Sequence, residues 1–119
     1  MEIAIKSDVG QRRTLNEDAA GYFLNTQNVT LIVVCDGIGG HNAGDVASAM
    51  ALSHLGKRWE EESITDTEAA YQWLVKNIQA ENDRVFQKAN QYRELDGMGT
   101  TIVAAVIIDS ELLVANVGD

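Results

Sequence analysis

The order of the hydrophobic patterns along this chain limits its fold more than any other feature of the sequence. Near both ends, apolar and polar residues alternate or β-branched residues form short runs, as they do in strands. In the middle, apolar residues recur every three or four positions, as they do on the buried face of a helix. The patterns predict strands at 2–9, 19–24, 29–35, 100–108 and 112–117, and helices at 45–61 and 66–92. Because strands and helices are segregated rather than alternating, we expect an α+β fold in which helices cover an antiparallel sheet.

Local signals support these boundaries. The polar residues 25–28 and 109–111 each suit a turn between paired strands. Thr65 followed by Glu68 has the spacing of a capping box, which predicts the start of the second helix. Each helix is expected to bury one apolar face, made of Leu52, Leu55 and Trp59 in the first and of Ala70, Leu74, Ile78, Val85, Ala89 and Tyr92 in the second.

Length and charge exclude several classes of protein. A chain of 119 residues is the size of one domain, and a net charge of -9 with only nine Lys and Arg argues against nucleic-acid binding. The longest apolar runs, 31–35 and 102–108, are far shorter than the ~20 residues of a membrane span. The first residues lack the pattern of a signal peptide, so we expect a cytoplasmic protein. The lone Cys35 is interpreted as a small buried hydrophobe rather than a nucleophile.

Two stretches rich in glycine or charge could carry chemistry. Asp36 ends an apolar run and precedes glycines at 37, 39, 40 and 44, which leave room for a metal ion beside a rigidly held carboxylate. An Asp that caps the next helix or folds back on its own backbone is the alternative. Residues 10–18 combine Arg12 and Arg13 with two carboxylates, the groups that bind phosphate and hard cations. A solvated polar connector would have the same composition.

Four short motifs, taken in their order along the chain, indicate a specific protein family. They are Arg13 with Asn16-Glu17-Asp18, then Asp36-Gly37-Ile38-Gly39-Gly40-His41, then Met98-Gly99-Thr100-Thr101, and finally Val117-Gly118-Asp119. This combination closely resembles the type 2C (PPM) family of metal-dependent protein serine/threonine phosphatases, in its bacterial form. The resemblance covers the whole chain but matches only the N-terminal half of the family's catalytic domain.

By this resemblance, residues 1–119 are the N-terminal part of a single catalytic domain. The implied fold is an antiparallel β-sandwich flanked by α-helices, in the layer order αββα. Two Mn²⁺ or Mg²⁺ ions would lie at one end between the sheets, and bacterial members hold a third, weaker ion. The implied reaction is hydrolysis of phosphoserine or phosphothreonine by a water that the metals activate. The implied partners are phosphorylated proteins, the substrates of a serine/threonine kinase.

The resemblance also assigns roles to individual residues. It implies that Arg13 binds the substrate phosphate and that Asp36 bridges both metals, which makes these two the catalytic residues. The other metal-binding positions that it implies are the carbonyl of Gly37, the water-holding carboxylates Glu17 and Asp18, and the third-metal carboxylate Asp119.

Some features depart from the family pattern or leave alternatives. Ile38 stands where many eukaryotic members carry a histidine that protonates the leaving group, so the general acid stays unassigned. His41 is interpreted as a loop histidine that orients the glycine turn, and His54 as a packing or solvated helix residue.

Two other functions stay open: a nucleotide-binding module, although the glycine spacing fits neither the dinucleotide motif nor the phosphate loop, and a non-catalytic interaction protein. The family's remaining metal-ligating aspartates lie beyond Asp119. We therefore expect the chain alone to be inactive, and either to self-associate or to depend on a complementing segment.

Overall fold

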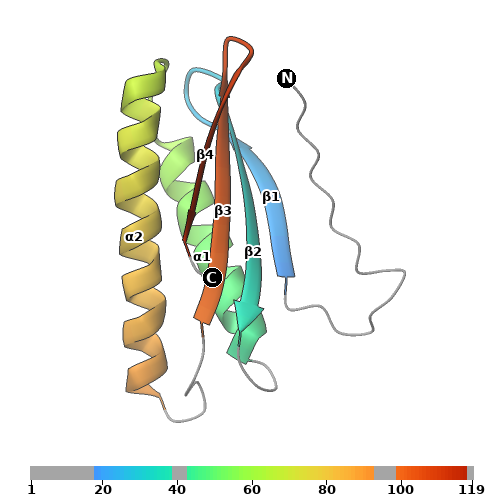
Figure 1. Ribbon diagram of the computed structural model, residues 1–119, viewed down its shortest axis with the longest axis vertical. Coiled ribbons are helices and arrows are strands. Elements are labelled where there is room, and N and C mark those ends of the chain that lie inside the picture. Colours follow the sequence, from blue (N-terminus) through green and yellow to red (C-terminus); the bar gives the residue numbers. More distant parts are fainter. Residues whose placement is uncertain (1–17, 39–42, 93–98, 118–119) are drawn as a thin grey trace, which may run out of the picture.

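The described residues form one antiparallel sheet with two helices on one of its faces. A computed structural model of the chain describes residues 18–38, 43–92 and 99–117. Its elements are β1 (Asp18–Leu24), β2 (Thr30–Ile38), α1 (Ala43–Glu60), α2 (Thr67–Gln91), β3 (Gly99–Ile108) and β4 (Glu111–Val117). The strands pair in sequence order, β1-β2-β3-β4 (Figure 1). This arrangement confirms the α+β prediction, and the predicted strand at 2–9 lies outside the described residues.

Both helices cover the same face of the sheet, where the core lies. Helix α1 packs mainly on β1 and β2, and α2 packs on β3 and β4. Because side chains alternate along a strand, every second residue of β2 faces the helices, and Leu31, Val33 and Cys35 are fully buried there. Between the helices, the rings of Trp59 and Trp73 meet edge to face at 4.9 Å. Burial of Cys35 confirms the prediction that it is a core residue.

The opposite face of the sheet is apolar and exposed. The register places Tyr22 opposite Ile32, Ile32 opposite Ala105, and Ala105 opposite Val114, in one row across all four strands. Tyr22 is 71% exposed and Val114 55%, so no described residue covers the ends of this row. An uncovered row of this kind is typical of a sheet that packs against another layer.

The predicted helix boundaries hold within two residues, but two details of α2 were wrong. Its N-cap is Asp66, not Thr65, because the Asp66 carboxylate accepts a hydrogen bond from the backbone N–H of Ala69 at 3.0 Å. Tyr92 is the C-cap residue and is 44% exposed, so it lies outside the buried stripe. The stripe instead includes Glu81, which is fully buried.

Both predicted turns are confirmed. Asn25 closes the first one: its Oδ1 accepts from the backbone N–H groups of Gln27 and Val29, and its Nδ2 donates to the carbonyl of Ile64 at 2.9 Å. This last bond ties the β1–β2 turn to the connection between the helices. Asp109 and Ser110 make the second turn, and their φ angles of 50° and 71° suit the tight hairpin that joins β3 to β4. Neither of the two helices is long and apolar enough to cross a membrane.

Candidate functional site

Asp36 lies at one end of the uncovered sheet face. The sequence placed it in a loop after a strand that ends at Cys35, but β2 continues to Ile38, so Asp36 is held inside the sheet. The reason is that β1 and β3 both pair with this part of β2, with Asp18 on one side of Asp36 and Thr101 on the other. Because Cys35 faces the helices, Asp36 faces the other way, and it is exposed.

The backbone beneath Asp36 is supported by a buried threonine. The hydroxyl oxygen of Thr100 lies 3.3 Å from the carbonyl oxygen of Asp36 and 2.8 Å from the carbonyl oxygen of Thr101. A hydroxyl has one proton to donate, so the shorter contact is the stronger one. Thr100 also pairs with Gly37 across the two strands. Gly37 therefore belongs to the sheet and Gly44 to α1, while positions 39–42 of the predicted glycine-rich stretch lie outside the described residues.

The chemistry of Cys35 is set by the core. Burial, and then the negative charge of Glu81, raise the pKa of this thiol to about 12, while a hydrogen bond with Thr100 acts in the opposite direction. A thiol with this pKa stays protonated at neutral pH, and only the thiolate is a strong nucleophile. Of the two neighbours on β2, Asp36 is the one that can bind a ligand.

The structure brings together part of the predicted site. Asp18, Asp36 and Gly37 lie at the same end of the sheet, and Asp18 is the direct cross-strand partner of Asp36. Arg13, Glu17, His41 and Asp119 lie outside the described residues, so their predicted roles stay predictions.

The donors at this end fit a hard divalent cation, because carboxylate, hydroxyl and backbone carbonyl oxygens are the ligands that Mn²⁺ and Mg²⁺ prefer. Within 18–38, 43–92 and 99–117, no group of three or more His, Cys, Asp and Glu side chains could hold a metal ion.

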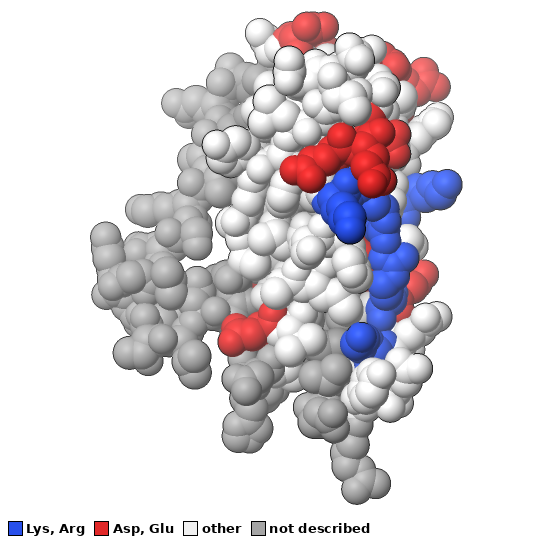
Figure 2. Space-filling model, turned by 180° about the vertical axis from the view of Figure 1, so that it is seen from behind, with Lys and Arg blue, Asp and Glu red and all other residues white. Residues whose placement is uncertain are grey.

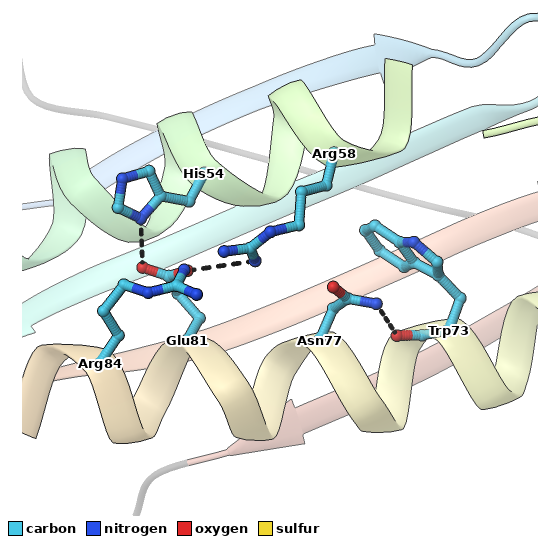
Figure 3. A network of polar contacts seen from close by, with 6 residues as sticks. All are labelled: His54, Arg58, Trp73, Asn77, Glu81 and Arg84. Carbon is cyan, nitrogen blue, oxygen red and sulfur yellow. Dashed lines mark hydrogen bonds and ion pairs between the residues drawn. The ribbon is translucent and has the colours of Figure 1, made fainter. Parts of the chain in front are cut away.

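A second polar cluster was missed by the sequence analysis. Glu81 of α2 is fully buried, and its carboxylate contacts three cationic or titratable groups: His54 Nδ1 at 2.8 Å, Arg84 Nη1 at 2.8 Å and Arg58 Nη1 at 3.4 Å (Figure 3). When the carboxylate is ionised it can only accept hydrogen bonds, and His54 Nδ1 is then the donor, because the roles in this contact depend on the tautomer of the imidazole. His54 is thus neither simple packing nor simply solvated.

Two signals in the sequence could have indicated this cluster. Position 81 continues the buried stripe of α2, three residues after Ile78 and four before Val85, so a carboxylate there must be buried and must find partners. His54 and Arg58 are four residues apart, on the same side of α1.

The chain is similar to known phosphatases over nearly its whole length. The family described as "Protein phosphatase 2C" matches residues 10–119. The "Serine/threonine phosphatase stp" of Listeria monocytogenes is 42% identical to it, and "Protein phosphatase PhpP" of Streptococcus pneumoniae is 38% identical. Each alignment covers 100% of this chain and 48% of the relative, so the chain spans about half the length of the curated relatives it matches.

Solved structures agree with these relatives. The serine/threonine phosphatase of S. agalactiae superposes with a TM-score of 0.88 at 38% identity, over 99% of this chain and 48% of that one. Serine/threonine phosphatase Stp1 from Staphylococcus aureus superposes with a TM-score of 0.85 at 44% identity, over 94% of this chain and 44% of that one. The observed sheet and helices are therefore those of the N-terminal part of these proteins.

Proposed function

This chain belongs to the protein phosphatase 2C family, and on that basis we propose that the whole protein hydrolyses phosphoserine and phosphothreonine in proteins. The observation that carries the proposal is the position of Asp36: an exposed carboxylate fixed inside the sheet, with Asp18 as its cross-strand partner. The names of the relatives, which are serine/threonine and protein phosphatases, support the choice of substrate class.

Asp36 is suited to bridge two cations because its backbone is paired on both sides and cannot shift without breaking the sheet. Its two carboxylate oxygens can each face a different ion. Gly37 follows without a side chain, so its carbonyl oxygen can be approached closely. Two Mn²⁺ or Mg²⁺ ions bound here would supply the acidity that makes water a nucleophile at neutral pH.

Other residues complete the proposed site. Arg13 provides a planar fork with which to hold the substrate phosphate, and Glu17 and Asp18 provide carboxylates for the waters around the cations. Asp119 would help to hold the third, weaker ion. These assignments rest on the motif match and on the oxygen-only donor set at this end of the sheet.

We also propose that residues 1–119 form the N-terminal part of one αββα domain whose second sheet packs on the exposed face of β1–β4. The exposed face is apolar along the row from Tyr22 to Val114, as an inter-sheet surface must be. A hollow of about 340 Å³, lined by Ala20, Gly21, Tyr22, Thr30 and Ile32, would receive a side chain from that sheet. The domain would act in the cytoplasm on proteins phosphorylated by a serine/threonine kinase.

The test is the substitution Asp36→Asn in the whole protein. The variant should fold normally and lose Mn²⁺-dependent hydrolysis of a small aryl phosphate, since a neutral amide has only one acceptor oxygen and cannot bridge two cations. Asp109→Asn is the matched control, because it makes the same change at the β3–β4 turn, where asparagine tolerates the positive φ. If Asp36→Asn retains more than about a tenth of the activity, Asp36 does not bridge the metals.

A further inference from the structure

The Glu81 cluster lies on the other side of the sheet from Asp36. It is built between α1 and α2, the helices that cover the core face, whereas Asp36 faces the uncovered side. The activity proposed above uses none of its residues. Figure 3 shows Arg58 and His54 reaching from α1 and Arg84 from α2 toward the one carboxylate.

The cluster has more positive than negative charge. One carboxylate, that of Glu81, faces two guanidinium groups that are charged at every physiological pH, and His54 adds a further charge when it is protonated. Asp83, next to Arg84 in the sequence, accepts a hydrogen bond from Gln79 instead. In the described part of the chain, the ion pairs of Arg58 and Arg84 all go to Glu81, which leaves an excess of at least one positive charge.

Basic side chains gather beside the cluster although the chain as a whole is acidic (Figure 2). The net charge is -9, yet every Lys and Arg in the described ranges belongs to α1 or α2: Lys57, Arg58, Lys76, Arg84 and Lys88. Figure 2, which views the molecule from behind, shows Lys and Arg in one band along this side. Positive side chains gathered in one band attract anions, although α1 and α2 together carry as many Asp and Glu as Lys and Arg.

The two guanidinium groups are held side by side, and among the described residues each contacts Glu81 through Nη1 alone. Both Nη1 atoms contact the same oxygen, Oε1 of Glu81, so the groups are neighbours in space. Each guanidinium has five N–H donors, and the side chains are 30% and 42% exposed. Glu81 is fully buried and fixes both arginines in place, so a ligand would not have to order them.

We propose that Arg58 and Arg84, with His54 beside them, form a binding site for a phosphate group, separate from the Asp36 end of the sheet. A phosphate offers three acceptor oxygens and close to two negative charges, which matches two adjacent guanidinium forks, whereas a carboxylate is matched by one. The phosphate could belong to free inorganic phosphate or to a phosphorylated side chain of a protein. The site goes beyond the proposed phosphatase activity and does not depend on it.

The test uses the whole protein with metals removed by EDTA, so that the Asp36 end takes no part. Inorganic phosphate is titrated at constant ionic strength while the NMR signals of the Arg58 and Arg84 side chains are followed. We expect saturable shifts with a Kd of about 1 to 10 mM, and no shift when chloride replaces phosphate. Arg84→Gln should weaken binding about tenfold, and Lys76→Gln, a control that removes an exposed charge from the same helix, by no more than about twofold.

A second variant and a second ligand distinguish the possible outcomes of this experiment. If Arg84→Gln fails to fold, Arg84→Lys keeps the charge beside Glu81 but loses the planar fork, and it should also weaken binding severalfold. A phosphopeptide that binds about tenfold more tightly than free phosphate, with shifts at the same two arginines, identifies a phosphorylated protein as the ligand. Equal affinities identify the free ion. The proposal is wrong if phosphate causes no saturable shift, or if Arg84→Gln and Lys76→Gln weaken binding equally.

Discussion

Gly56 is the position where a single methyl group should do the most measurable damage. It lies in α1 against the ring of Phe23 on β1, and a Cβ added there would stand 2.6 Å from Cδ1 of that ring and still closer to Cε1 and Cζ. Carbon atoms of unbonded groups do not approach to such distances, so either the helix or the ring must move. The lack of a side chain at Gly56 therefore allows the ring of Phe23 to lie this close to α1.

The size of the effect follows from two opposing terms. Alanine in place of glycine inside a helix stabilises by about 1 kcal/mol, because it lowers the backbone entropy of the unfolded chain. Forcing a methyl group into a packed contact costs about 1 to 3 kcal/mol. The ring of Phe23 is partly buried and packs against the core cluster, so displacing it disturbs that packing, and we expect Gly56→Ala to lower the free energy of unfolding by about 1 kcal/mol net.

Urea unfolding of the whole protein, followed by the fluorescence of Trp59 and Trp73, measures this change, and a double-mutant cycle with Phe23→Ala assigns it. In the Phe23→Ala background the clash is absent, so Gly56→Ala should stabilise by about 1 kcal/mol, which gives a coupling energy of about 2 kcal/mol. Ser53→Ala, an exposed control on the same helix, should stabilise slightly in both backgrounds. If Gly56→Ala stabilises the protein that retains Phe23, the close approach of α1 to β1 is not as described.

Three further predictions concern the site and the chain as a whole. Arg13→Ala should raise KM for phosphorylated substrates with little change in Mn²⁺ affinity, and loss of Mn²⁺ binding in calorimetry would instead make Arg13 structural. Folding raises the pKa of Cys35 from 9.0 to about 12, so the folded state holds the thiol proton to a higher pH than the unfolded state does. The contribution of Cys35 to stability should therefore be complete below about pH 9 and should decrease as the pH rises toward 12. Urea unfolding should show that Cys35→Ala removes this decrease. The chain of residues 1–119 alone should show no turnover and should associate through its exposed sheet face or edge strands; a monomeric preparation that hydrolyses a phosphopeptide in Mn²⁺ would contradict this.

The sequence predicted the elements well because each is a local pattern. The apolar run of β2, the stripe of α2 and the polar turn after Leu24 are each visible within a few residues; the strand and the turn are confirmed, and so is the stripe except for Tyr92. The small errors have local causes too. Asp66 is a better N-cap than Thr65, and a strand paired on both sides runs on through Asp36 and Gly37 although glycine disfavours it.

What the sequence could not predict depends on pairing between distant segments. The contact between Glu81 and His54 joins residues 27 positions apart on two helices, so no pattern within one helix identifies the partner of Glu81. The placement of Asp18 opposite Asp36 follows from the register of β1 on β2, which the turn around Asn25 fixes. The motif match predicted that Asp36 and Asp18 belong to one site, but only the register of β1 on β2 explains why the two residues lie opposite each other.

Because side chains alternate between the two faces of β2, the Glu81 cluster and Asp36 lie on opposite sides of the sheet. Cys35 and Asp36 are neighbours in sequence but face opposite sides, the thiol toward Glu81 and the carboxylate toward the uncovered face. The charge of Glu81 is felt at Cys35, one residue from the carboxylate that we propose as the metal bridge. Arg58 and Arg84 contact the Glu81 carboxylate from the two helices, so they offset its charge on the side away from β2.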